Sequence, residues 1–130
     1  WLLGEQLFTT VRKDCINGFV GAIDTESGEN RLVDWVNKHQ LDAIVAVGIC
    51  TDICVMDFVL TILSARNHGL MPGLRDIVVF EPGCATYDMS KEAATAIGLP
   101  ETAAHPQHVT HHLGLYFMAS RGALLADELI

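Results

Sequence analysis

The sequence predicts an α/β domain, a three-layer structure in which a parallel β-sheet carries helices on both faces. Two uninterrupted apolar runs, 43–48 and 77–80, are typical of strands buried on both faces of a sheet. Each run is followed by a short connection and then by a segment with a helical pattern. Alternating strands and helices favour a parallel sheet, because parallel neighbours need a crossover connection between them.

Length and composition agree with one domain over residues 1–130. Half of the residues are hydrophobic, so the chain can bury a core without disulfides or a structural metal. The formal net charge of −8 would repel nucleic acid and anionic membrane surfaces. The most apolar helical segment, 55–63, contains Asp57 and falls far short of the roughly 20 residues of a membrane span. We therefore expect a soluble domain with no nucleic-acid or membrane partner.

The first elements are a strand and a short helix. Residues 7–11 are rich in β-formers and precede a polar, Gly-containing stretch, which predicts a short strand with Lys13 at its end. The opening residues lack both an initiator Met and the order of a signal peptide, so we expect an N-terminal truncation. A short amphipathic helix follows, with Asn30 as its cap and its apolar residues at i, i+3 and i+4: Leu32, Trp35 and Val36.

The run 43–48 is predicted to be a central strand, and the helix after it has the strongest pattern in the chain. Thr51 or Asp52 can cap this helix, and Gly69 ends it. Its apolar residues stand at i, i+3, i+4, i+7 and i+8, namely Val55, Phe58, Val59, Ile62 and Leu63.

The second half of the chain repeats this order. The strand 77–80 leads through a loop of small residues to a helix from about Ser90 to Ile97. A last helix is predicted to start at Pro106, because the missing N–H of proline costs nothing in a first turn. We expect this helix to bury four apolar residues, Val109, Leu113, Tyr116 and Phe117. The tail 122–126 can add one more strand.

Cys54 is the candidate nucleophile. The segment 48–54 crosses from the carboxyl end of a strand into a helix, the place where functional groups gather in open parallel sheets. In a first helical turn, unpaired N–H groups and the helix dipole stabilise a thiolate, and a nearby Lys13 would add to this. The same N–H groups could hold an oxyanion during acyl transfer. The alternative that Cys54 is a small buried core residue stays equally open on these grounds.

Two further interpretations of the cysteines are weaker. Cys50 and Cys54 could bind zinc together with two histidines from the group at 105–112. The spacing of the two cysteines differs from that of zinc knuckles, however, and no second cysteine pair follows. A redox dithiol usually has two residues between its cysteines, not three. The last three of the histidines at 105, 108, 111 and 112 are more simply surface residues, because a helix near the end of the chain can expose them. Because Cys15, Cys50, Cys54 and Cys84 lie in apolar segments without a secretory signal, we expect reduced thiols and a cytoplasmic location.

Several motifs resemble those of a known family. The stretch VGICTDICV, residues 47–55, resembles the signature of isochorismatase-like cysteine hydrolases. The stretch VRKDCINGFVG, residues 11–21, resembles the segment that carries their essential lysine. The similarity continues through SARNHG, GCATYD and AHPQHVTHHLGLY, where the chain looks like the plant-type nicotinamidases of that family. The resemblance covers nearly the whole sequence and implies a Rossmann-like sheet flanked by helices.

The resemblance also implies a set of functional residues. Cys54 matches the nucleophile and Lys13 matches the lysine of an aspartate, lysine and cysteine triad. A cis peptide would join Ile49 and Cys50, and the backbone N–H groups of Cys50 and Cys54 would form the oxyanion hole. The implied reaction is hydrolysis of nicotinamide to nicotinate and ammonia through a thioester on Cys54. Asp14 is given no role in it, and Asp52 is interpreted as a helix cap or as part of the signature turn.

In that family the triad aspartate and the ligands of a divalent, zinc-like metal precede the lysine. We therefore expect them upstream of Trp1, on a first strand and helix that this C-terminal part of a domain lacks. No metal or other cofactor would then be bound by residues of this chain, and the fragment alone should be nearly inactive. The apolar surface left uncovered could favour a homo-oligomer.

Two alternatives to nicotinamide hydrolysis remain open. The substrate could be another small amide or a ureido compound, because the residues that would contact it are not identified in this chain. The chain could also be a non-catalytic binding module that kept the sheet and lost the site.

Overall fold

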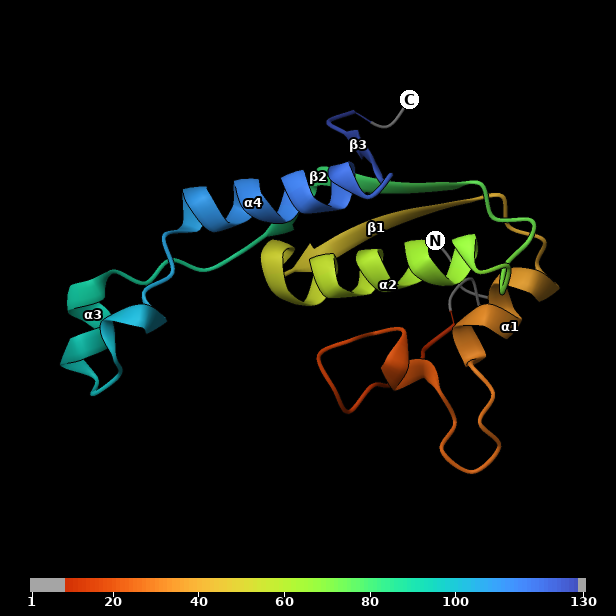
Figure 1. Cartoon of the computed structure of the whole chain (residues 1–130), viewed down its shortest axis with the longest axis horizontal. Coiled ribbons are helices and arrows are strands. Elements are labelled where there is room, and N and C mark those ends of the chain that lie inside the picture. Colours follow the sequence, from red (N-terminus) through yellow and green to blue (C-terminus); the bar gives the residue numbers. More distant parts are fainter. Residues whose placement is uncertain (1–8, 129–130) are drawn as a thin grey trace, which may run out of the picture.

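The computed structural model describes residues 9–128, and within them it confirms the α/β class. A three-stranded parallel sheet has the order β1-β2-β3, with β1 at Ala43–Ile49, β2 at Asp76–Ala85 and β3 at Leu124–Ala126 (Figure 1). Val78 on β2 pairs with Val45 on one side and with Leu124 on the other. The predicted strands 43–48 and 77–80 and the predicted strand in the tail are therefore present, but within residues 9–128 the central strand is β2, and β1, which was predicted to be central, lies at an edge.

Strand β2 is longer than the sequence predicts. It continues past Phe80 through Pro82 and Gly83, residues that normally end a strand. The pairing with β1 adapts by a register shift between Ala46 and Gly48, so that Gly48 pairs with Cys84. Gly83 permits this close approach, since a Cβ there would lie 2.6 Å from Cγ1 of Val47. The extension brings the end of β2 alongside the end of β1.

The helices agree with the predicted order and with most of the predicted caps. They are α1 (Arg31–Lys38), α2 (Met56–Asn67), α3 (Lys91–Ala96) and α4 (Gln107–Ser120), with short turns η1 (Val20–Ala22), η2 (Thr51–Val55) and η3 (Glu101–Ala103). Asn30 caps α1 and Ser90 caps α3 through their side-chain oxygens. Gly69 follows the end of α2 with a φ of +93°, a conformation that glycine adopts without strain.

The core lies between one face of the sheet and the helices α2 and α4. It contains Val59 and Ile62 of α2, Met118 of α4, and Ile77 and Val79 of β2, all of them buried. Side chains of the opposite face of β1 are exposed, with fractions of 49% for Val45, 56% for Val47 and 73% for Ile49. Within residues 9–128, therefore, α2 and α4 cover the same face.

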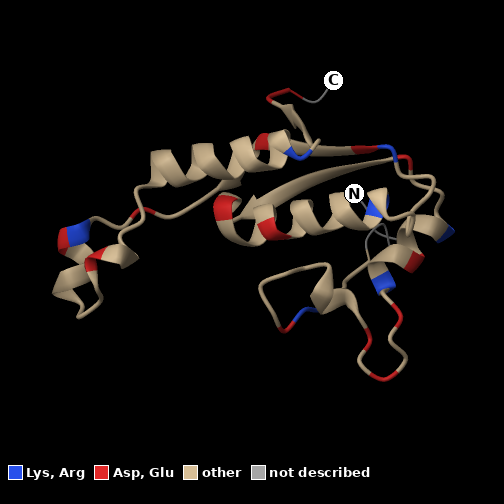
Figure 2. Ribbon diagram, viewed as in Figure 1, with Lys and Arg blue, Asp and Glu red and all other residues tan. Residues whose placement is uncertain are grey.

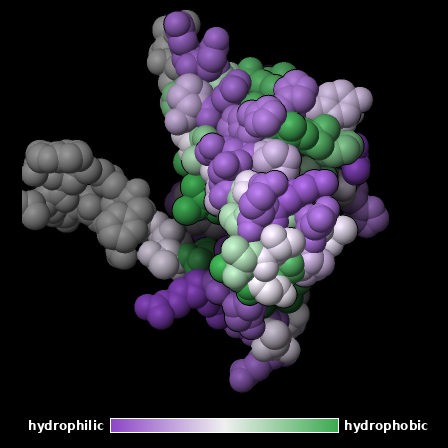
Figure 3. Space-filling model, turned by 90° about the vertical axis from the view of Figure 1, so that its left-hand side faces the viewer, coloured by the Kyte–Doolittle hydropathy of each residue, from purple (hydrophilic) through white to green (hydrophobic). Residues whose placement is uncertain are grey.

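The predicted burial of α4 is wrong. Val109, Leu113, Tyr116 and Phe117 are exposed by 41 to 57%, and the residues that α4 buries are Gly114, Leu115 and Met118. The apolar residues of α4 are distributed over most sides of the helix. Their spacing therefore does not indicate which side is buried. Figure 2 shows that α4 carries no charged side chain. Seen from the α3 end, apolar side chains form separate patches among hydrophilic ones (Figure 3).

Two other findings concern the N-terminal region and membranes. The strand predicted over residues 7–11 lies partly outside the described residues, and residues 9–11 do not belong to the sheet. Among residues 9–128 there is no helix with the length and apolar character needed to cross a bilayer.

Candidate active site

The turn that carries Cys54 follows the last residue of β1. The peptide bond between Ile49 and Cys50 is cis, and the backbone of Cys50 is extended. The carbonyl of Cys50 accepts hydrogen bonds from the N–H groups of Ile53 at 3.2 Å and of Val55 at 3.1 Å. The bond from Val55 closes a π-helical turn, Thr51–Val55, which continues directly into α2. Such widened turns are frequent at functional sites.

The predicted caps of this helix are wrong. Cys50 occupies the N-cap position, and neither Thr51 nor Asp52 makes a side-chain capping bond. Thr51 Oγ1 instead lies 2.9 Å from Nδ1 of His111, and Asp52 accepts a bond from Thr86 Oγ1 at 2.6 Å. The turn is thus held by more distant parts of the chain.

Cys54 and Lys13 line the same cavity, which has a volume of about 400 Å³. The thiol is partly exposed there, in the first turn of the helical segment. Most of the wall is apolar, and the lining residues include Ile16, Val45, Val47, Ile49 and Phe58. A thiol and a cation on a mainly apolar cavity are the groups needed for nucleophilic attack on a small uncharged substrate.

Lys13 is held by the loop that follows it. Its Nζ donates hydrogen bonds to the carbonyls of Cys15 and Ile16, both at 2.9 Å. Gly21 allows the loop to pack on this side chain, because a Cβ at residue 21 would lie 2.4 Å from Cβ of Lys13. Among the described residues, Nζ makes no hydrogen bond to Sγ of Cys54. The two predicted residues therefore share a cavity without direct contact.

A larger cavity of about 550 Å³ lies on the other side of this loop, around Arg12, Asp24 and Arg31. Arg31 and Asp24 form an ion pair at 2.7 Å there. Hydrogen bonds from the Ser27 N–H, the Arg31 guanidinium and the Glu26 N–H lower the pKa of Asp24 to about 2. Cys54 does not line this cavity, so we place the chemistry in the smaller one.

The other three cysteines lie in different surroundings, and all four are free thiols. Cys15 is exposed, and its Sγ lies 3.2 Å from the carbonyl of Asn17. Cys84 is buried on β2, and burial raises the pKa of its thiol. Cys50 is partly exposed and ends the extended segment before the turn. Cys54 alone among them both lies in the helical turn and lines the cavity with Lys13.

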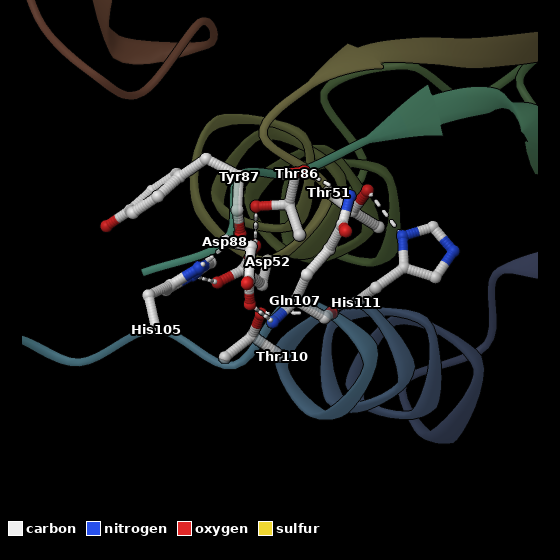
Figure 4. Close-up of polar contacts among 9 residues, drawn as sticks. All are labelled: Thr51, Asp52, Thr86, Tyr87, Asp88, His105, Gln107, Thr110 and His111. Atoms are coloured by element: carbon white, nitrogen blue, oxygen red, sulfur yellow. Dashed lines mark hydrogen bonds and ion pairs between the residues drawn. The ribbon is translucent and has the colours of Figure 1, made fainter. Parts of the chain in front are cut away.

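Asp52 forms a partly buried ion pair with His105 (Figure 4). Nε2 of His105 lies 2.7 Å from Oδ2 of Asp52, and Nδ1 lies 2.8 Å from the carbonyl of Tyr87. Burial lowers the pKa of His105, but its bonds to Asp52 and Tyr87 outweigh this and raise the pKa. For Asp52, burial raises the pKa, and bonds from Thr86 and His105 outweigh it and lower the pKa. The Tyr87 ring stacks on the imidazole at 3.9 Å.

The interpretation of His108, His111 and His112 as surface residues holds for two of the three. His108 and His112 are exposed. The side chain of His105 is only 11% exposed and that of His111 only 25%, and His111 also lies 3.7 Å from Glu81. The sequence missed these pairs because no periodicity relates residue 52 to residue 105. The spacing of His108, His111 and His112 indicates only that they belong to one helix. It does not indicate that His111 contacts Thr51 in the turn before α2.

Residues 9–128 contain no group of three or more His, Cys, Asp or Glu side chains arranged to hold a metal ion. The zinc interpretation of Cys50 and Cys54 therefore lacks further ligands in this part of the chain. The described residues therefore do not form a binding site for the metal that the resemblance implies.

Comparisons with known proteins found a matching sequence family, a similar sequence and a similar structure. Residues 7–106 match the sequence family described as the Isochorismatase domain. The chain is 50% identical over 129 residues to Nicotinamidase 1 of Arabidopsis thaliana, a match that covers 99% of this chain and 52% of that protein. It thus spans about half the length of this curated relative. Among solved structures it is similar to YcaC from Pseudomonas aeruginosa with hexane-2,5-diol and covalent acrylamide, with a TM-score of 0.47 and 18% identity, covering 82% of this chain and 39% of that one.

Proposed function

Because the chain belongs to the isochorismatase family, we propose that it provides the nucleophile and its surroundings for the hydrolysis of nicotinamide to nicotinate and ammonia. The observation that carries this proposal is the cavity that Cys54 and Lys13 share. The substrate class is supported by the identity of 50% to a protein named a nicotinamidase. An aromatic amide suits a cavity with a mainly apolar wall.

Cys54 is the residue that forms and breaks the covalent bond. Its Sγ attacks the amide carbon, and the electron pair of the C=O bond moves to oxygen. When the tetrahedral intermediate collapses, the C–N bond breaks and ammonia leaves with the proton it needs. Water then attacks the thioester, the C–S bond breaks, and nicotinate and the free thiol are released. The two steps together consume one amide and one water.

The surroundings of Cys54 stabilise charge at both stages. The positive end of the helical segment and the ammonium of Lys13 favour the thiolate before attack. The backbone N–H groups of Cys50 and Cys54 form the oxyanion hole, which stabilises the negative charge that develops on the carbonyl oxygen.

The proton transfer to ammonia needs an acid that we place outside these 130 residues. The triad of the family contains an aspartate, and Asp52 is already engaged with Thr86 and His105. Any divalent metal would likewise take its ligands from outside the described residues. We therefore expect residues 1–130 alone to release ammonia far more slowly than a complete nicotinamidase.

The location that we propose is the cytoplasm, where thiols stay reduced, because the reaction requires the free thiol of Cys54. Formation of nicotinate would place the protein in NAD salvage.

The test is ammonia release from nicotinamide by Cys54→Ala and Cys54→Ser variants of the longest natural protein that contains this chain. Both should lose nearly all turnover, because serine at this position lacks the nucleophilicity of a thiolate. Cys15→Ser is the matched control, since it changes an exposed thiol outside the Cys54 cavity and keeps the backbone around Lys13. Ammonia release by Cys54→Ala at the unmodified rate would overturn the proposal.

A further inference from the structure

Residues 105–114 hold the Cys54 turn at three points. Gly114 of α4 packs against Asp52 so closely that a Cβ at residue 114 would lie 2.8 Å from Cα of Asp52. His111, one helical turn earlier, lies 2.9 Å from Thr51 Oγ1. His105, just before α4, binds the carboxylate of Asp52. Two successive residues of the turn are thus each fixed by a histidine.

The hydrogen bond between Asp52 and His105, at 2.7 Å, is shorter than that between Thr51 and His111, at 2.9 Å. Both ring nitrogens of His105 face oxygen acceptors, a carboxylate at 2.7 Å and a carbonyl at 2.8 Å. An acceptor can be satisfied only by a nitrogen that carries a proton, so both nitrogens are protonated and the ring is an imidazolium. The second oxygen of Asp52 accepts from Thr86. The pair is therefore a charged bridge whose polar groups are satisfied.

We propose that Asp52 and His105 form a positioning pair, which holds the Cys54 turn against α4 and so sets the orientation of the thiol in its cavity. The inference rests on the proposed function, because it takes Cys54 as the nucleophile. Asp52 precedes Cys54 by two residues in the same π-helical turn, so a shift of Asp52 moves the backbone of Cys54 as well. Neither Asp52 nor His105 lines the cavity, so the pair acts through the turn and not on the substrate.

The charge of His105 depends on few neighbouring groups. The turn η2 contributes Asp52, and the loop after β2 contributes the stacked ring of Tyr87. Asp88 of the same loop accepts a bond from the N–H of Gln107. From the first turn of α4 comes Gln107, whose amide is uncharged and bonds to the carbonyl of Thr86. Deprotonation of His105 would leave one ring proton for two acceptors, so the ion pair and one of the two hydrogen bonds would be lost.

The experiment compares Asp52→Asn, His105→Gln and the double variant of the full protein, with His112→Gln as the control on an exposed α4 histidine. The rate of Cys54 alkylation by iodoacetamide is measured by peptide mass spectrometry, with Cys15 as the internal reference. Each single variant should lower the Cys54 rate relative to Cys15 by about tenfold, and kcat for nicotinamide similarly, with KM within about twofold, because misplacement of a nucleophile affects the chemical step.

The double variant should be no slower than the single ones, because the two residues act as a unit. Two further readouts separate positioning from general stability. The ratio of the Cys54 rate in the unmodified protein to that in His105→Gln, measured at each pH, should fall towards one as the pH rises through the pKa of His105. Nitrogen NMR of histidine-labelled, unmodified protein at pH 7 should find protons on both ring nitrogens of His105.

A neutral ring of His105 at pH 7 would overturn the proposal even if every variant failed to fold. Single variants within twofold of the unmodified rate, or effects that multiply in the double variant, would overturn it as well. If the unmodified protein releases no ammonia from nicotinamide, the proposed function fails. The alkylation rates and the NMR measurement still decide the positioning role in that case.

Discussion

Gly114 of α4 and Asp52 of the Cys54 turn are in backbone contact, because the missing side chain of Gly114 leaves room for the Cα and N atoms of Asp52. A Cβ on residue 114 would lie 2.8 Å from that Cα and 3.0 Å from that N, and neither atom can move alone. Gly114 thus sets the distance between α4 and the turn.

Replacement of this glycine should displace the turn. We expect Gly114→Ala to lower the free energy of unfolding by about 1–3 kcal/mol, the usual cost of overpacking a tight contact, and to slow Cys54 alkylation. Urea unfolding measures the first effect. Gly73→Ala is the matched control, since a Cβ there would meet only the carbonyl of Leu41 at an ordinary 3.8 Å. Equal stability of the two variants would contradict the contact.

The bridge between Asp52 and His105 should make stability depend on pH. The pKa of His105 is raised above its ordinary 6.5, so its contribution is complete below that pH and is lost as the pH rises through the raised value. The pKa of Asp52 is lowered below 3.8, so its contribution is complete above that pH and is lost on further acidification. The pair contributes most between these limits. Urea unfolding from pH 5 to 9 should therefore show a loss of stability as the pH rises above 6.5 that His105→Gln lacks.

The four thiols should differ in accessibility. Cys84 is buried and burial raises its pKa, whereas Cys15 is exposed, so iodoacetamide should modify Cys15 at least about tenfold faster in the folded protein at pH 7.5. Unfolding in urea should remove most of this difference. Rapid modification of Cys84 in the absence of urea would contradict its burial on β2.

Asn30 links α1 to the segment that follows the Lys13 loop. Its Oδ1 accepts bonds from the N–H groups of Leu32 and Val33, and its Nδ2 donates to the carbonyl of Phe19 at 2.8 Å. Asn30→Ala should cost about 1–2 kcal/mol of unfolding free energy through the lost cap. Asn30→Asp keeps the cap and loses only the bond to Phe19, so its stability should lie between those of the alanine variant and the unmodified protein.

Local features of the fold could be predicted from the sequence. The helix after Asn30 was predictable because a cap and an apolar spacing lie within a few residues of each other. Cys54 could be placed in a helical turn at the end of β1 because an apolar run and a strong helical pattern meet there. The extension of β2 could not be predicted, because Pro82 and Gly83 normally end strands. They can remain in β2 only because the pairing of β2 with β1 shifts register there, and the sequence does not show this shift.

Contacts between distant segments were beyond local patterns. The bridge from Asp52 to His105 spans 53 positions, and neither residue stands in a spacing that indicates the other. The buried face of α4 was predicted wrongly for a related reason. Its apolar residues are distributed over most sides of the helix. The buried side contains Gly114, whose missing side chain allows the backbone of the Cys54 turn to approach closely.

The position of α4 couples the core to the site in a single cooperative unit. Met118 of this helix belongs to the hydrophobic core, while Gly114 and His111 contact the turn. When α4 detaches in a local opening, the core loses Met118 and the turn loses its support in the same event. Amide hydrogen exchange in 51–55 should therefore proceed at the opening rate of α4, and the reactive geometry of Cys54 should have the lifetime of that helix on the sheet.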